Sequence, residues 1–321
     1  MMTMFGAALT VLALAIFIDL ILGEPPLWLH PTVLMGKAIG AGVRVAPGSS
    51  SRLQRAYGVV LALGTVAIFA GSSYLILRAT QVLGEPVQIL LGALLLKPTF
   101  SIRLMRDYAS KLASAVQRGD WAQAKDVLGH IVRRDPDRLT RLQMMSAGVE
   151  SVAESTTDGI TSPLFYYALF GVPGAIAYRA INTLDSMIGY KDPRFVHLGW
   201  FSSKLDSIAN WPSARLTSIL TIISAVFLGR SPFNTWRILL RDRNRTESWN
   251  AGWVMSAMAG ALNIQLEKPG FYVLGDRERE LAPGHLVEAT RIMALNTILF
   301  VSLVVLPVIL EVEKLRAIIG H

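Results

Sequence analysis

The sequence contains no cysteine, which excludes disulfides, thiolate-bound zinc or iron–sulfur centres and a cysteine nucleophile. Charged residues are also scarce, at 17% of the 321 residues against about 25% in an average soluble protein. Hydrophobic residues reach 52%. A chain this apolar and this weakly charged is neither disordered nor typical of a wholly soluble protein.

Motifs common in soluble nucleotide and metal enzymes are missing as well. Gly36-Lys37 lacks the preceding glycine of a P-loop, and Gly40-Ala41-Gly42 lacks the third glycine of a dinucleotide-binding fingerprint. No HExxH motif occurs, and the five histidines are scattered. These absences argue against P-loop ATPases, Rossmann enzymes and zincin proteases.

Long segments with almost no charge predict helices that cross a membrane, which takes about 20 apolar residues. Residues 1–22, with Asp19 as their one charge, 57–77 and 292–310 meet this length. No Lys or Arg precedes Lys37, so the first segment lacks the basic start of a cleaved signal peptide. We therefore expect it to be a retained first helix.

Three further apolar segments are shorter or interrupted. Residues 86–96 and 216–229 fit a short span, a re-entrant segment or a buried helix. Residues 159–178 are uncharged but contain Pro163, Pro173 and three glycines, which predicts a broken or kinked helix.

Between these segments the chain is polar, with the spacing of amphipathic helices and with Asp120 as a plausible helix N-cap. The basic residues gather in two blocks, nine in 103–141 and eight in 230–279, which the positive-inside rule assigns to the cytoplasm. The net charge of +8 suits an anionic membrane surface or anionic ligands. We predict an all-α, multi-pass integral membrane protein, one membrane-embedded domain over 1–321 with polar inserts at about 98–158 and 230–290.

An acidic stripe precedes the interrupted segment. Glu150, Glu154 and Asp158 follow one another at four-residue intervals, so a regular helix presents all three carboxylates on one face. A solvated acidic face is one interpretation. A Mg²⁺ site is the other, since a cation would offset the repulsion between the carboxylates.

Ionisable residues beside apolar segments are the next candidates, because such positions are costly and often functional. Arg179 and Asp185 flank Asn182 at one end of the interrupted segment, and Asp19 lies near the end of the first helix. Arg179 fits an interfacial anchor equally well. Glu24 and His30 follow Asp19, although a lone histidine is more often structural than a ligand.

A second block, residues 248–276, is uncharged over its first 19 residues. Its small residues Gly252, Ser256 and Gly260 recur every four positions and permit close approach of another helix or of a flat ligand, with helix packing favoured. Lys268 then begins a Lys-Pro-Gly turn that could bring a cation to a phosphate.

Taken in order, these blocks resemble the CobD/CbiB family, the adenosylcobinamide-phosphate synthases of cobalamin biosynthesis. The likeness covers nearly the whole chain and is most specific over residues 150–190. Shorter matches include Asp19 to Pro25, His30-Pro31, Lys97 to Phe100, Arg134-Asp135, Gly199-Trp200, Leu205-Asp206, Asn210 and Asn250 to Gly275. The chain departs from the family pattern at Ser155, where the family usually has Asn, at Ser207, where it has a second Asp, and at Pro212-Ser213.

The resemblance implies an enzyme that joins aminopropanol, or its O-phosphate, to the free carboxylate of adenosylcobyric acid through an amide bond. ATP and Mg²⁺ are implied as requirements, with an acyl phosphate as the expected intermediate. The implied surroundings are the lipid bilayer of the cell membrane and, among possible partners, other late corrinoid-pathway enzymes. Nucleic acid is not expected, since no recognition motif is present.

The resulting hypothesis gives each candidate residue a role. Glu150, Glu154 and Asp158 hold Mg²⁺; Arg179, Arg215 and Lys268 neutralise phosphate or carboxylate charge; and Asp185 or Asp206 accepts a proton from the amine. The substrate-binding candidates are Asp19, Glu24, His30, Lys97, Asn182, Arg215 and Asn250. Trp200, Trp249 and Trp253 could line the corrin face, although packing or placement at the membrane interface is favoured for each.

Two other classes compete with the enzyme. A transporter also uses broken helices and intramembrane charge, but predicts a symmetry between the halves that is not visible in the sequence. A non-catalytic membrane sensor related to the family is the second alternative. The acidic stripe and the dense block at 148–190 favour the enzyme.

Overall fold

The computed structural model describes residues 4–28, 30–48 and 50–319, and almost all of its regular structure is helical. This confirms the prediction of an all-α, multi-pass membrane protein. The chain divides into two compact units. Residues 1–3 of the predicted first span lie outside the described residues.

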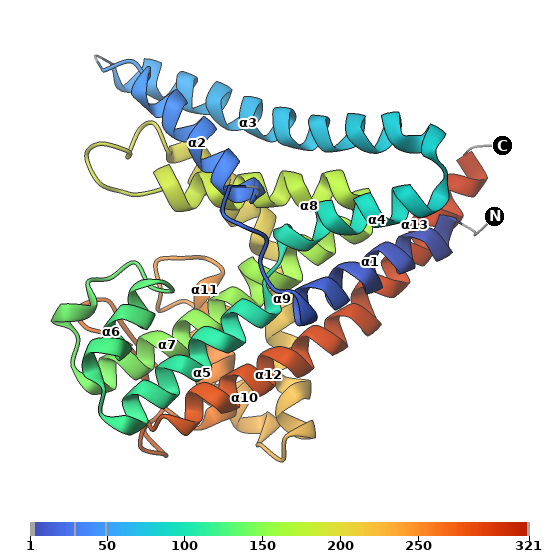
Figure 1. Ribbon diagram of the computed structural model, residues 1–321. Helices are drawn as coiled ribbons and strands as arrows, with labels where there is room; N and C mark the ends of the chain where they lie inside the picture. The colour runs from blue at the N-terminus through green and yellow to red at the C-terminus, as the bar shows by residue number, and fades with distance from the viewer. Residues whose placement is uncertain (1–3, 29, 49, 320–321) are drawn as a thin grey trace. The chain divides into compact units, whose positions relative to one another are not determined.

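Unit 1 comprises residues 1–101, 162–210 and 302–321. Within it α3 packs along α8, α1 packs against α4 and α13, and α2 and α4 also contact α8 (Figure 1). Its elements are α1 (Met4–Ile21), α2 (Pro31–Arg44), α3 (Ser51–Ala79), η1 (Thr80–Leu83), α4 (Glu85–Leu96), η2 (Lys97–Thr99), α8 (Ser162–Ile188), the first part of α9 (Trp200–Phe227) and α13 (Leu306–Ile319).

Two glycines shape the helices of unit 1. Gly23, with φ +77°, follows the end of α1. Gly171 interrupts α8 with φ +67° and ψ −160°, a conformation nearly exclusive to glycine, and Pro173 follows it. The prediction of a kinked helix at 159–178 is therefore confirmed.

Unit 2 comprises residues 102–161 and 211–301, so most of the two expected polar inserts, 98–158 and 230–290, fall in it. In it α7 contacts α5, α11, α12 and strand β1. Its elements are α5 (Ile102–Arg118), α6 (Trp121–Gly129), η3 (Pro136–Arg138), α7 (Arg141–Thr156), η4 (Thr157–Thr161), the second part of α9, α10 (Pro232–Asp242), α11 (Ala251–Leu262), β1 (Leu266–Lys268), β2 (Tyr272–Leu274) and α12 (Gly284–Phe300); η5 (Val301–Val305) follows α12.

Capping residues define the helix boundaries of unit 2. Asp120 is the N-cap of α6, as predicted, and its carboxylate accepts the backbone N–H of Gln123 at 3.0 Å. Thr140 and Gln143 form a capping box that starts α7. These bonds use backbone donors that an uncapped helix end would leave without partners.

A short antiparallel hairpin, β1 paired with β2, is the one strand pair among the described residues and was not expected from the sequence. Three-residue strands are too short for an alternating pattern to stand out. Gly270, with φ +77°, lies in the predicted Lys-Pro-Gly turn, which connects the two strands. The turn therefore presents Lys268 on a hairpin.

The small residues of α11 serve helix packing, as the sequence favoured. A Cβ added to Gly260 would lie 2.8 Å from the Cα of Thr235 in α10, and one on Gly252 would lie 2.2 Å from the carbonyl oxygen of Arg243. Both distances are too short for a side chain at either position. The two glycines therefore allow α11 to lie directly against neighbouring protein backbone.

Four helical segments in the described part of the chain are long and apolar enough to cross a membrane: Ser51–Leu83, Glu85–Arg118, Arg141–Ile188 and Gly284–Ile318. They contain the expected segments 57–77, 86–96, 159–178 and 292–310. The first predicted span corresponds to a shorter apolar helix, Phe5–Ile21, and 216–229 is not among the candidate spans. The latter segment continues α9, where polar residues precede it.

Candidate functional site

Four of the predicted substrate-binding residues meet in unit 1 in what we call the N-terminal ion network: Asp19, Glu24, His30 and Lys97. The ammonium of Lys97 lies 3.2 Å from Asp19 Oδ1 and 2.6 Å from Glu24 Oε2. His30 Nε2 is 3.1 Å from the same Glu24 oxygen. Asp19 is fully buried, and the Lys97 side chain is 3% exposed. One buried cation therefore pairs with two acidic side chains.

Local structure explains why these residues converge. Asp19 lies in the last turn of α1, and Lys97 begins η2 directly after α4, which packs on α1. His30 is the N-cap of α2, and its Nδ1 accepts the backbone N–H of Thr32 at 3.3 Å. This contact orients the ring so that Nε2 faces Glu24.

The network keeps Glu24 ionised. Burial alone would raise the pKa of Glu24, but the hydrogen bonds with His30 and Lys97 and their charges outweigh it and lower that pKa below its ordinary value. The carboxylate is therefore a fixed negative charge beside a buried lysine.

A second group in unit 1, the α8–α9 polar network, contains the predicted residues Arg179, Asn182 and Asp206. Arg179 Nη1 donates to Asn182 Oδ1, and Asn182 Nδ2 donates to Asp206 Oδ1, both at 3.3 Å. The other Asp206 oxygen accepts from Asn210 Nδ2 at 3.1 Å. Asn210 in turn accepts from Tyr178 at 2.7 Å. The structure therefore joins these three predicted residues in one chain of hydrogen bonds.

Asp185, the other predicted proton acceptor, lies in the last turn of α8. Its backbone carbonyl accepts the N–H of Gly189 at 2.8 Å, and a Cβ on Gly189 would lie 2.0 Å from Asp185 Oδ1. The carboxylate therefore packs against a position where any side chain would collide with it.

In unit 2, Glu150 of α7 is the centre of a third group, the Glu150 cluster. Its side chain is 3% exposed and accepts from Ser146 Oγ at 2.7 Å, from Tyr272 at 2.8 Å and from the guanidinium of Arg134. Burial, followed by the nearby Glu150 charge, raises the pKa of Tyr272, so the phenol stays protonated and donates. Glu150 is thus fully engaged with protein donors.

The predicted magnesium ligands do not form a ready-made metal site. Over the described residues, no group of three or more Asp, Glu or His side chains is arranged to hold a metal ion. Glu154 is exposed one turn after Glu150, and Asp158 lies in the π-helical turn η4, which breaks the regular spacing of the stripe. Magnesium would fit here only with phosphate oxygens or waters completing its shell.

Glu154 nevertheless lies among cations. It interacts electrostatically with Arg133, Arg134 and Lys268. Lys268 Nζ stands 4.4 Å from the ring centre of Phe271, at the hairpin turn. Three positive side chains that act on one carboxyl group are suited to a ligand that carries phosphate together with a metal ion.

The predicted residues Arg215 and Asn250 also meet in unit 2. The Arg215 guanidinium donates to Asn250 Oδ1 and, at 3.0 Å, to the carbonyl of Trp249. It lies 4.7 Å from the ring centre of Trp253, which the guanidinium of Arg243 approaches to 4.9 Å. We call this set the Arg–Trp cluster. It holds two positive charges against one indole.

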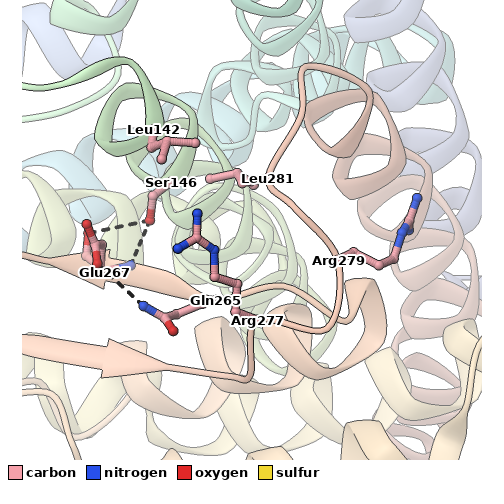
Figure 2. Close-up of a pocket in the computed structure, with 7 residues that line it drawn as sticks. All are labelled: Leu142, Ser146, Gln265, Glu267, Arg277, Arg279 and Leu281. Carbon is pink, nitrogen blue, oxygen red and sulfur yellow. Dashed lines mark hydrogen bonds between the residues drawn. The ribbon is translucent and has the colours of Figure 1, made fainter.

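Next to the Glu150 cluster is a pocket of about 80 Å³, shown in Figure 2. Helix α7, strand β1 and the segment that precedes α12 line it. The lining residues are Leu142, Ser146, Gln265, Glu267, Arg277, Arg279 and Leu281.

Several residues of the pocket, the Glu150 cluster and the Arg–Trp cluster were not singled out from the sequence. Ser146 precedes Glu150 by four residues, a helical spacing that could have identified it. Tyr272 lies 122 residues from Glu150, and Arg243 lies 28 residues from Arg215. Contacts of this kind depend on tertiary packing and leave no local signal.

Trp200, proposed for the corrin face, lies in unit 1 with the guanidinium of Arg55 5.9 Å from its ring centre.

Comparisons with known proteins cover nearly the whole chain. A family model described as CobD/Cbib protein matches residues 12–298. A probable cobalamin biosynthesis protein CobD of Methanothermobacter thermautotrophicus is 40% identical over 291 residues, covering 91% of this chain and 95% of its own. The cobalamin biosynthesis protein CobD of Dehalococcoides mccartyi is 39% identical, with 86% and 89% covered. No solved structure matches the chain.

Proposed function

Because the chain belongs to the CobD/CbiB family, we propose that it is a cobalamin-biosynthesis enzyme that forms an amide in the cell membrane. Its substrates are the free carboxylate of adenosylcobyric acid and the amine of aminopropanol or of aminopropanol O-phosphate. The product is adenosylcobinamide or its phosphate. The observation on which this proposal depends is the surroundings of Glu154 in unit 2, where Arg133, Arg134 and Lys268 interact electrostatically with the carboxyl group.

The chemistry explains why a phosphate-binding surface matters. A carboxylate and an ammonium do not condense in water without activation, and phosphoryl transfer from ATP to the carboxylate would supply it. The amine then displaces phosphate from the acyl phosphate and loses a proton, giving the amide, ADP and inorganic phosphate. Arg134, which also pairs with Glu150, and Lys268 are proposed to stabilise phosphate charge. Mg²⁺, when bound with the nucleotide, would neutralise further phosphate charge, and Glu154 is its proposed protein ligand.

The unit 1 residues have supporting roles in this proposal. Asp206 accepts hydrogen bonds at both oxygens, and Asp185 packs against Gly189. Each remains a proposed proton acceptor for the amine. Arg179 is proposed to bind an anionic substrate group, while Lys97 is proposed to fix the acids of the N-terminal ion network.

The Arg–Trp cluster is the proposed contact for the corrinoid. Arg215 and Arg243 supply positive charge for its carboxylate or for phosphate, and Trp249 and Trp253 offer apolar ring surface. Trp249 is 56% exposed and is therefore accessible to a ligand. Its substitution by alanine is expected to raise the KM for the corrinoid more than it changes kcat.

Growth complementation tests the proposed reaction. A corrinoid-auxotrophic strain lacking its own synthase should grow on cobinamide without this gene, and should grow on cobyric acid only when the gene is supplied. A requirement for the gene even when cobinamide is provided would contradict the proposal. Such a result would favour a transporter or a later step.

A further inference from the structure

We propose that the pocket of Figure 2 is the subsite for the small amine substrate, and that Glu267 and Arg277 recognise its two ends. The assignment rests on the proposed function for the identity of the amine. The ligand class is an aliphatic amino alcohol O-phosphate, positively charged at one end and negatively charged at the other.

The size of the pocket limits what can enter it. Its volume is about 80 Å³. Sites for drug-sized ligands and cofactors are typically ~300–1,000 Å³, so the pocket by itself suits a smaller ligand. A chain of three carbons with a charged group at the pocket mouth is of that kind.

Arg277 supplies the positive end of the pocket. Figure 2 shows its guanidinium pointing towards Ser146 and Leu281, into the pocket. Of the two pocket arginines, Arg279 is already paired with Glu288 at 3.2 Å. Arg277 forms no ion pair or side-chain hydrogen bond with any other described residue. It is therefore available for a phosphate.

Glu267 supplies the negative end. Its backbone N–H donates to Ser146 Oγ at 2.8 Å, which fixes strand β1 against α7. Its carboxylate accepts only a long contact, 3.4 Å, from Gln265 Nε2, and within the described part of the chain it pairs with no cation. Glu267 and Arg277 do not pair with each other, so the pocket keeps opposite charges apart.

The remaining walls complete the match. Leu142 and Leu281 provide apolar contacts for the carbon chain of the ligand. Ser146 links the pocket to the Glu150 cluster, because its hydroxyl accepts from Glu267 and donates to Glu150 at 2.7 Å. An amine bound here therefore lies next to the surface that we propose for phosphate.

Calorimetric titration of the full-length protein in phosphatidylcholine nanodiscs tests this assignment without requiring turnover. The probes are aminopropanol O-phosphate, aminopropanol and inorganic phosphate. The variant Arg277→Gln should bind the phosphate ester about ten- to hundred-fold more weakly and change the affinity for aminopropanol by less than about threefold. Glu267→Gln should weaken both amines by about tenfold or more. Arg138→Gln and Glu280→Gln are matched controls at exposed positions outside the pocket and should bind as the wild type does.

Three results would overturn the subsite. They are no binding of either amine to the wild type, unchanged affinities in both pocket variants, and loss of amine binding when the nanodiscs contain phosphatidylethanolamine. The last result would assign the pocket to a lipid headgroup. If the variants bind the amines more weakly but the wild type forms no product, the subsite is supported and the proposed function is contradicted. The binding titration therefore tests the subsite, and product formation tests the proposed function.

Discussion

Lys97 is a lysine with almost no exposed surface, placed between Asp19 and Glu24. A buried charge is costly unless it is paired, and removing one partner of a buried pair leaves the other charge uncompensated. The substitution Lys97→Met keeps much of the side-chain volume but leaves two acidic groups without their cation. We expect it to lower the free energy of unfolding by about 3–5 kcal/mol.

Thermal unfolding in detergent, followed by tryptophan fluorescence, measures this loss. Lys37→Met is the matched control, because Lys37 is an exposed lysine of α2. The control should unfold close to the wild-type temperature. Equal stability of the two variants would show that the N-terminal ion network contributes nothing to folding.

The same network predicts an acid dependence. The pKa of Glu24 is lower in the folded protein than its ordinary value of 4.5, so its ionised form stabilises the fold. This stabilisation is complete above pH 4.5 and is lost as the pH falls through the folded-state pKa. The wild type should therefore be more stable than Glu24→Gln at pH 7, and the difference should shrink below pH 4.5. A difference that stays constant down to pH 3 would contradict this account of Glu24.

At the scale of elements, the kink in α8 depends on one residue. Gly171 adopts φ +67° and ψ −160°, where a Cβ is strongly disfavoured. Gly171→Ala should destabilise the protein by about 1–3 kcal/mol. Gly64→Ala is the control, because Gly64 lies within α3 with open space around it, and there alanine should be neutral or stabilising. Thermal unfolding of both variants is the measurement, and a stabilised Gly171→Ala would refute the kink.

Helices were predictable from the sequence where the signal is local. The Asp120 cap, the turn at Gly270 and the interruption of 159–178 follow from residue types at neighbouring positions. The π-helical turn η4 was not predictable, because its widened spacing has no marker in the sequence. It shifts Asp158 out of line with Glu150 and Glu154. The expected face of three carboxylates assumed a regular α-helix and therefore does not form.

The site residues could likewise be named from the sequence where the signal is local, but their contacts could not. Asp19, Glu24, His30 and Lys97 could be named from the sequence, but their pairing joins positions 78 residues apart, from 19 to 97. Glu267 and Arg277 have no unusual local context and became candidates only through the shape of a pocket. Residue type therefore identifies candidates, while tertiary packing decides which of them act together.

At the scale of the whole molecule, the low overall charge has a clear distribution. Unit 2 contains both basic blocks and the surroundings of Glu154, while unit 1 contains the apolar helix α3 and the buried ion pairs of Lys97. The net charge of +8 has two proposed uses, contact with a membrane surface and binding of anionic ligands. Both uses agree with the proposed amide synthase.

The most direct test of the central claim is the product formed by the purified full-length protein. Adenosylcobyric acid, aminopropanol or its O-phosphate, ATP and Mg²⁺ are supplied, and the corrinoid is analysed by mass spectrometry. The account predicts adenosylcobinamide or its phosphate with one ADP per amide, and at least about a 100-fold loss in Glu154→Gln, which should insert into the membrane normally. A folded wild-type protein that forms no amide from either amine would contradict it.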